Sequence, residues 1–384
     1  MQKFFLFRNP FLTILLSVSF YSTKSFGQKE ASIWFFGNEC AIDFSYSYPV
    51  AVTVSAMKTD EGSTSMCNSG GWLQFYTNGA AVWNKNHQIM PHGKMLKGHV
   101  SSSQSALAVP NPGNPNIIYL FTSDAGAYAD PPNVGVNYYT IDMTLDKGKG
   151  DIKGKEVQLV PNACEKLTAV KHKNGKDVWV MAHGWCTQNF YCYLVTKDGV
   201  SKIPVMSKIG SIHCGGNTTD GNGIGYMKFS PDGSKLAAVI YQNNFWELYD
   251  FNNETGTLSN YRVIYTPQDK LGYGCEFSPN GKLFYISFYF TNEVYQYDVS
   301  FNNTADLMSS AVLVVQSLDK KMGALQNAID GKIYVTKNSE YLGCIPNPNV
   351  KGTGCGYIED ALYLDGGKPK LGLPNYITSY FFRQ

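Results

Sequence analysis

Short runs of apolar and aromatic residues, each opened by a tight turn, recur along the whole chain. The copies of this pattern span 69–76, 112–121, 174–180, 230–236, 278–285 and 330–335. The turn glycines of the last three copies, Gly233, Gly281 and Gly331, lie 48 and 50 residues apart. Asn-Gly and Asp-Gly pairs supply the positive φ angles that a tight hairpin needs, so each copy predicts a β-hairpin.

Further apolar segments place four strands in each repeat. In one repeat we expect strands at 224–229, 236–241, 245–251 and 262–265, and in the next at 274–277, 283–288, 293–299 and 311–315. Four strands with a period of 40 to 50 residues are typical of one blade of a β-propeller. Six repeats are visible directly. A seventh is assembled from both ends, from 33–37 and 41–44 beside 376–381.

The sequence therefore predicts an all-β fold, a single propeller domain over residues 28–384 with seven four-stranded blades. Six or eight blades are the alternatives. Strands from both termini are expected to close the ring, which removes the exposed sheet edges that invite aggregation.

Residues 1–27 have the features of a secretory signal peptide. Lys3 and Arg8 precede an apolar run at 11–20, and Ser25 and Gly27 are the small residues before a cleavage point. The apolar run is too short to span a bilayer, and we predict no transmembrane segment. The mature chain is expected to be secreted to the periplasm or the cell surface.

Composition narrows the classes of partner. The chain of 384 residues has 32 Lys and Arg against 30 Asp and Glu, a net charge of +2. This balance gives no electrostatic basis for nucleic-acid binding. The 26 Tyr and 22 Phe, with only 16% charged residues, suit packed strands and exclude a disordered chain.

All nine cysteines lie in the predicted mature chain, where an exported protein forms disulfides. Cys186 and Cys192 flank a short turn between two strand-like runs and are the first predicted pair. Cys344 and Cys355 bracket a Pro/Gly/Asn loop and are the second. The remaining five cannot be paired from the sequence, and the odd total leaves one thiol over. The spacings are not those of a zinc site.

Several phrases together resemble a known family. They are 33–38, 78–87, 165–172, 224–233 and 372–376. As a set they resemble the N-terminal, WD-like propeller of large secreted Bacteroidetes proteins associated with gliding motility and type nine secretion. The resemblance implies a cell-surface context at the outer membrane and supplies no catalytic residues. Relatives usually continue into PKD-like and sorting domains, so this chain is either a stand-alone member or a fragment.

The face on which the inner strands begin is the usual ligand site of a propeller. The polar and aromatic residues expected there are Glu165, Lys166, Tyr226, Tyr273, Glu276 and Gln326, with Asp124, His183 and Trp185 from neighbouring loops. One interpretation is a pocket for a glycan, a peptide or a metal ion, anchored by Glu165, His183 and Glu276. The other is structural: these side chains hydrogen-bond adjacent blades or line a channel.

Motifs of nucleophilic catalysis and nucleotide binding do not appear in the sequence. It contains no Gly-x-Ser-x-Gly elbow, P-loop or dinucleotide fingerprint. Asp142, Asp250 and Asp298 each end a third strand in similar phrases, which predicts structural turn acceptors rather than catalytic carboxylates.

Three hypotheses of function follow. The leading one is a non-enzymatic propeller that binds a protein or glycan at the bacterial envelope, with no cofactor. The second is a lactonase- or lyase-like enzyme in which Glu165, Glu276 and His183 surround an axial divalent cation. The third is a structural docking subunit of an outer-membrane-associated complex.

Overall fold

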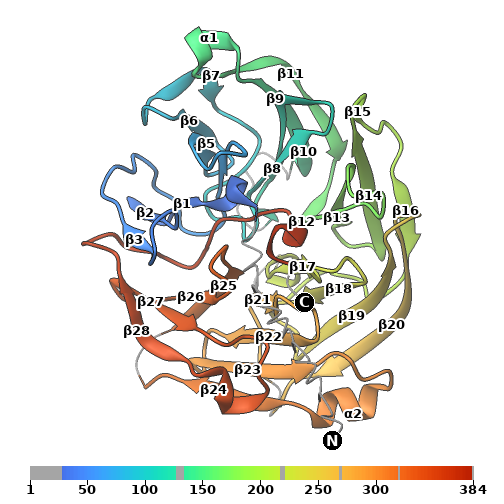
Figure 1. Cartoon of the computed structure of the whole chain (residues 1–384). Coiled ribbons are helices and arrows are strands. Elements are labelled where there is room, and N and C mark those ends of the chain that lie inside the picture. The colour runs from blue at the N-terminus through green and yellow to red at the C-terminus, as the bar shows by residue number, and fades with distance from the viewer. Residues whose placement is uncertain (1–27, 127–133, 217–220, 268–269, 319–320, 383–384) are drawn as a thin grey trace, which may run out of the picture.

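Seven antiparallel sheets stand around a central axis in the computed structural model, which describes residues 28–126, 134–216, 221–267, 270–318 and 321–382 (Figure 1). The predicted seven-bladed, all-β propeller is confirmed. The predicted signal peptide lies outside the described residues. Among the described helices, none has the length and apolar character to cross a membrane.

Each sheet takes consecutive strands from the chain. The first has β1 (Ile33–Phe36), β2 (Cys40–Asp43) and β3 (Val50–Ala51). The second has β4 (Thr64–Cys67), β5 (Leu73–Thr77), β6 (Ala81–Asn84) and β7 (Ile89–Lys94). The third has β8 (Ala106–Asn111), β9 (Asn114–Ser123), β10 (Val136–Asp142) and β11 (Asp151–Val160). The fourth has β12 (Ala163–Lys171), β13 (Val178–Gly184), β14 (Asn189–Thr196), β15 (Gly199–Val200) and β16 (Val205–Lys208), the last two both pairing with β14.

The remaining sheets repeat the four-stranded pattern. The fifth has β17 (Met227–Phe229), β18 (Lys235–Val239), β19 (Phe245–Asn252) and β20 (Thr257–Tyr265). The sixth has β21 (Cys275–Phe277), β22 (Leu283–Phe288), β23 (Glu293–Asp298) and β24 (Val312–Gln316). The seventh has β25 (Met322–Asn327), β26 (Ile333–Lys337), β27 (Tyr341–Ile345) and β28 (Ile358–Tyr363).

Helices are few and short in the part of the chain that the structure describes. The α-helical turns are α1 (Leu145–Gly148) and α2 (Thr304–Ser309). The 3₁₀ turns are η1 (Lys29–Ala31), η3 (Gly221–Gly223), η5 (Gly352–Cys355) and η6 (Thr378–Phe381).

The repeated turn has the predicted hairpin geometry. Gly233, Gly281 and Gly331 have φ angles of 71°, 71° and 84°, which only glycine adopts without strain. Each donates its N–H to the carbonyl three residues earlier, at 2.9, 2.8 and 2.9 Å. These turns connect an inner strand to the next strand in three successive sheets, so the sequence repeat is a structural repeat.

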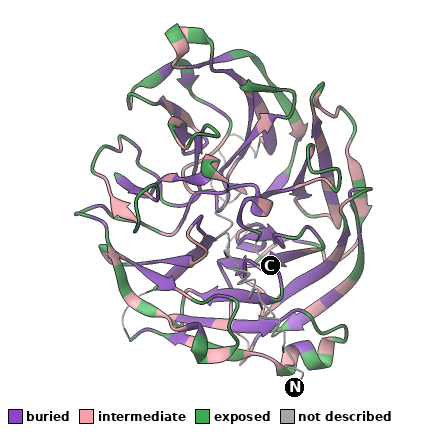
Figure 2. Ribbon diagram, viewed as in Figure 1, coloured by how far each residue is buried: buried purple, intermediate pink, exposed green. Residues whose placement is uncertain are grey.

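Burial falls from the axis outward. In β12, β22 and β25 nearly every residue is buried, whereas the outer strand β28 is mostly exposed or half-buried (Figure 2). Aromatic rings fill the wedges between sheets; for example, Trp246 of β19 packs 4.4 Å from Phe284 of β22, centroid to centroid. Apolar packing between neighbouring sheets therefore supplies most of the driving force for the ring.

The C-terminal segment closes the ring from the inner position of the first sheet. Leu371 donates its N–H to Asp60 O at 3.0 Å and accepts from Ala324 N at 2.8 Å. Asn375 then donates its N–H to Ser63 O at 2.8 Å. Residues 371–375 therefore lie between β25 and β4, where the inner strand of the first sheet belongs. The prediction that both ends close the ring is confirmed.

The closing segment differs in detail from the prediction. We expected 376–381 to be a strand beside 33–37, but it crosses to β12 and ends in η6. Side chains replace the ladder there: Thr378 Oγ1 donates to Ala169 O at 3.1 Å, and Lys171 N donates to Ser379 Oγ at 3.0 Å. These hydroxyl groups hydrogen-bond to the unpaired edge of β12 in place of backbone groups. The backbone of 378–381 therefore does not have to form a strand there and forms the turn η6 instead (Figure 1).

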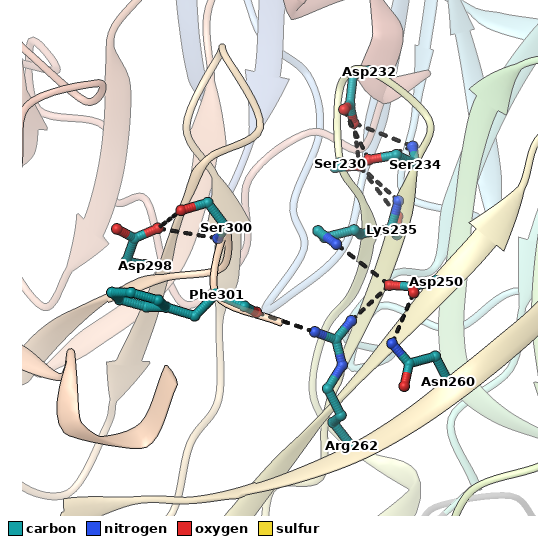
Figure 3. A network of polar contacts seen from close by, with 10 residues as sticks. All are labelled: Ser230, Asp232, Ser234, Lys235, Asp250, Asn260, Arg262, Asp298, Ser300 and Phe301. Carbon is teal, nitrogen blue, oxygen red and sulfur yellow. Dashed lines mark hydrogen bonds and ion pairs between the residues drawn. The ribbon is translucent and has the colours of Figure 1, made fainter. Parts of the chain in front are cut away.

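The aspartates that end the third strands are structural, as predicted, but in two ways (Figure 3). Asp298 Oδ1 accepts from Ser300 N at 3.0 Å and Ser300 Oγ at 2.5 Å, and Asp142 caps its turn in the same manner. Asp250 instead accepts from Arg262 at 2.6 Å and also contacts Lys235. Its carboxylate therefore joins neighbouring strands rather than capping a turn.

Replacing Asp298 with asparagine should destabilise the protein in a pH-dependent manner. Burial raises the pKa of Asp298, but hydrogen bonds from Lys351 and Ser300 lower it by more, so the net shift is downward. The carboxylate therefore stabilises the fold above the unfolded pKa of about 3.9, and this stability is lost as the pH falls through the folded value. At pH 7 the variant should lose about 1–3 kcal/mol of unfolding free energy.

Denaturant unfolding at pH 7 and pH 3 checks this. The difference in unfolding free energy between wild type and Asp298→Asn should be smaller at pH 3 than at pH 7. Asp198→Asn, whose ion pair with Lys197 is exposed, is the control and should change little. An equal loss at both pH values would show that the Asp298 charge is not the cause.

Candidate functional site

The polar residues predicted on the inner strands are enclosed within the ring rather than displayed on it. They are all at most 2% exposed: Glu165, Lys166, Tyr226, Tyr273, Glu276 and Gln326. His183, in β13, is also fully buried. The predicted residues therefore form an interior network, and their partners decide which of them are structural.

Glu276 and Gln326 connect neighbouring blades. Lys228 Nζ, from β17, lies 2.6 Å from Gln326 Oε1 and 3.3 Å from Glu276 Oε2. Asn327 N donates to the same Glu276 oxygen at 3.2 Å. Three inner strands are thereby joined through one buried lysine. The Glu276 carboxylate and the Gln326 amide oxygen are thus partnered inside the protein.

Three other predicted residues shape loops. Lys166 Nζ donates to Gly223 O at 3.0 Å and Ile224 O at 2.7 Å, and burial lowers its pKa. Asp124 accepts from Ala125 N at 2.9 Å and, with its other oxygen, from the N–H of residue 134 at 3.0 Å. Trp185 lies so close to Gly223 that an added Cβ there would be 3.1 Å from the indole ring.

Two glutamates lie close together near the mouth of the axis. Ser103 donates both its N–H and its hydroxyl to Glu165 Oε2, each at 2.9 Å. Tyr273 OH donates to Glu61 Oε2 at 2.9 Å. Burial, and then the charge of Glu165, raises the pKa of Glu61 to about 8, and burial raises the pKa of Glu165 to about 7. Glu61 was not predicted from the sequence, because its loop is brought to the axis only by ring closure.

A cleft opens beside this pair. Its volume is about 420 Å³, and it is lined by Asp60, Glu61, Ser101, Tyr289, Lys321, Asn338, Lys370 and Leu371. Glu61 is only 8% exposed, so a solute in the cleft reaches the edge of the pair and not Glu165 behind it.

A thiol and two imidazoles meet beside the axis in the fourth sheet. Cys164 of β12, His183 of β13 and His213, in the segment after β16, each bring one ligand atom within 4.8 Å of the others. Cys164 Sγ lies 3.6 Å from His183 Nδ1, and the two imidazole rings stack at 3.8 Å between centroids. Burial lowers the pKa of both histidines.

A buried carboxylate orients one of these rings. Glu247 Oε2 accepts from His213 Nε2 at 2.9 Å and from Tyr249 OH at 2.7 Å. Its other oxygen accepts from Ser211 N at 2.9 Å and Tyr261 OH at 3.1 Å. Burial raises the pKa of Glu247, but the charge and hydrogen bond of His213 lower it by more, so Glu247 is ionised.

The disulfide pairing was predicted wrongly. Cys186 bonds to Cys214, 28 residues later in the sequence. Cys192 faces an inter-sheet core cluster and lies opposite Met181 in β13, several residues from the turn that holds Cys186. The bond fastens the segment of His213 to the end of β13, and a disulfide agrees with the predicted export.

Cys344 and Cys355 are not paired either. Cys344 packs into the large central cluster, whereas Cys355 packs into the cluster between the sixth and seventh sheets. The two thiols therefore lie in different parts of the core. The sequence signal, a loop bracketed by cysteines, does not specify on which side of a sheet each thiol lies.

The opposite face of the ring carries a larger groove. Its volume is about 590 Å³, and its lining comes from turns at the far ends of β2, β4 and β25 and from η1: Lys29, Ser32, Phe44, Ser45, Tyr46, Ser47, Gly70, Gly71, Ile329 and Asp330. Tyr46, Tyr48 and Trp72 in these turns are 62%, 70% and 75% exposed. The predicted ligand face did not include this groove, because its residues follow the inner strands instead of preceding them.

Comparisons with known proteins show the fold alone. No known family model and no curated protein matches the sequence. A provisionally named 6-phosphogluconolactonase from Bacteroides fragilis aligns with a TM-score of 0.54, at 11% identity over 89% of this chain and 96% of its own. A periplasmic gluconolactonase from Pseudomonas aeruginosa aligns at 0.44, with 14% identity over 82% and 78%. The first of these similarities concerns the propeller scaffold alone.

Removing the disulfide should destabilise the protein and abolish its response to reductant. Cross-linking across 28 residues stabilises by roughly 3–4 kcal/mol in the chain-entropy account. The double variant Cys186→Ser/Cys214→Ser should lose about that much unfolding free energy. Denaturant unfolding with and without reductant measures this loss. The unfolding free energy of wild type should fall in reductant, and that of the double variant should not change.

The double variant Cys344→Ser/Cys355→Ser is the matched control and should stay sensitive to reductant. A cross-linked peptide that joins Cys186 to Cys192 in a non-reducing digest would refute the assignment.

Proposed function

We propose that the protein is a secreted, non-enzymatic propeller that binds a glycan at the bacterial envelope. The glycan would bind in the larger groove, on the face of the ring opposite the axial cleft. The observation that carries the proposal is the exposed ring of Tyr46 in the groove lining, with the exposed rings of Tyr48 and Trp72 next to lining residues in the same turns. Exposed aromatic residues gathered at one place mark interaction sites, whereas single ones do not.

The chemistry of the lining favours a glycan over a flat protein surface. Ser32, Ser45, Ser47, Lys29 and Asp330 bring hydroxyl and charged groups among the rings. Sugar hydroxyls hydrogen-bond to such groups, while their C–H faces pack on aromatic rings. The volume of about 590 Å³ is within the range of small-ligand sites.

The turns around the groove are held in place before a ligand binds. Asn68 Oδ1 accepts from Gly70 N at 3.0 Å and Trp72 N at 3.1 Å. Asp43 Oδ1 accepts from Ser45 N at 2.8 Å. Gly71 takes a φ of 90°, which fixes the bend before Trp72. Turns ordered in this way reduce the entropy that binding would otherwise cost.

The proposal also includes a location for the protein, the bacterial cell surface. The disulfide and the signal peptide expected at 1–27 support export. The resemblance to Bacteroidetes gliding-motility and type nine secretion propellers supports the cell surface. A surface protein of this kind would meet envelope polysaccharides directly.

The enzyme alternative lacks the arrangement it needs. It requires Glu165, Glu276 and His183 around one cation, but Glu276 pairs with Lys228, and His183 joins Cys164 and His213. The observation that still favours a hydrolase is the Glu61–Glu165 pair beside the axial cleft. Lactone or ester hydrolysis is therefore a direct test of this alternative.

Binding to purified envelope polysaccharides and oligosaccharides, measured by calorimetry with the mature chain, tests the proposal. Trp72→Ala and Tyr46→Ala should each weaken binding by about 10-fold, the effect typical of an aromatic contact residue. Tyr265→Ala is the matched control: it removes a ring of similar exposure, 54%, from the outer strand β20 and should leave binding unchanged.

Three outcomes would overturn the proposal. Equal loss in Tyr265→Ala would show a non-specific effect. A protein partner that co-purifies and competes at Trp72 would favour the docking-subunit hypothesis. Lactone hydrolysis that disappears in Glu61→Gln and persists in Trp72→Ala would make the protein an enzyme.

A further inference from the structure

We propose that Cys164, His183 and His213 bind one transition-metal ion, zinc or copper, in a closed site inside the fourth sheet. The site is separate from the groove of the proposed function and does not depend on it. It comes from three separate segments: the inner strand β12, the adjacent strand β13, and the segment that follows β16.

The distances suit ligands of one ion. Zinc binds cysteine sulfur at about 2.3 Å and histidine nitrogen at about 2.0 Å, so two such ligands in tetrahedral geometry lie roughly 3.5 Å apart. Cys164 Sγ and His183 Nδ1 are 3.6 Å apart. One nitrogen of His213 completes a set whose members all lie within 4.8 Å of one another.

An unsatisfied ring nitrogen points to a missing ligand. His213 Nδ1 is buried and has no hydrogen-bond partner, so it is available to an ion that Cys164 Sγ and His183 Nδ1 also bind. Buried polar atoms in proteins are usually paired, since leaving one unpaired is unfavourable. Glu247 already occupies His213 Nε2, so Nδ1 is the nitrogen of that ring left for an ion.

Glu247 supplies the outer shell of a metal site. A histidine that binds a metal usually passes its other N–H to a carboxylate, which fixes the tautomer and orientation of the ring. Glu247 does this for His213 and is itself fixed by Ser211, Tyr249 and Tyr261. Glu247 thus accepts four hydrogen bonds, more than are needed to orient a single buried histidine.

The ligand atoms select the class of ion. One thiolate and two imidazoles suit zinc and copper, whereas calcium and magnesium prefer oxygen ligands. Binding would convert the Cys164 thiol to a thiolate and release its proton to solvent. All three side chains are buried, so the ion would cross-link three segments and would not meet a substrate.

The disulfide positions the third ligand. Cys214 follows His213 directly, and its bond to Cys186 ties that segment to the end of β13, where His183 lies. Cys186 N also donates to His213 O at 3.0 Å. Cys214 is thus a positioning residue for a site that it does not ligate.

Metal analysis of the mature chain tests the proposal. The protein is purified without chelator and without a histidine tag. We expect about one zinc or copper per chain, with copper giving a visible thiolate charge-transfer band and zinc giving one only after exchange for cobalt. Cys164→Ser and His213→Gln should lose the ion and the band. Cys192→Ser and His172→Gln, a cysteine of the same sheet and a half-buried histidine outside the cluster, should keep both.

Two further variants keep the test decisive if the ligand variants fail to fold. Glu247→Gln should weaken affinity for the metal roughly 10–100-fold, as outer-shell changes do, and so should Cys214→Ser. Wild-type protein that binds neither zinc nor copper, before or after reconstitution, overturns the proposal. So does a bound ion whose cobalt form has no thiolate band, or one that survives in Cys164→Ser.

Discussion

Seven sheets can share one axis only if the last is joined to the first, and residues 371–377 make that join. Their backbone bonds to β25 on one side and to the chain entering β4 on the other, and Ile377 then bridges to β12. Closing the ring removes the free sheet edges and at the same time fills the inner position of the first sheet. The polar residues on the inner strands are thereby enclosed, and each must find a partner inside the protein.

Some of these enclosed groups are satisfied by neighbouring blades, whereas others keep an atom without a hydrogen bond. Lys228, Glu276 and Gln326 join three blades, and Lys166 binds two carbonyls. His183 Nε2, His213 Nδ1 and Glu165 Oε1 are left without a hydrogen bond. The scaffold and the site therefore use the same residue types in the same interior, and the site differs in that three ligand atoms converge within 4.8 Å.

The hairpin turns, the number of blades and the closure by both ends were predictable because local turn chemistry repeats at a fixed period. The partners of buried residues were not. Cys186 was paired with its neighbour in sequence, whereas Cys214 reaches it through a segment with no regular pattern. Glu61 and His213 lie in such segments too, and only the closed ring brings them to Glu165 and Cys164. The aromatic groove was missed because turns at both ends of the inner strands carry similar residues.

X-ray absorption at the metal edge of natively purified protein tests the central claim most directly, that the unsatisfied group beside the axis is a metal centre. The account predicts a first shell with one sulfur at about 2.3 Å and two imidazole nitrogens at about 2.0 Å. A shell of oxygen and nitrogen without sulfur would place the ion elsewhere and contradict the account. An edge too weak for stoichiometric metal would leave the three side chains as a buried structural cluster.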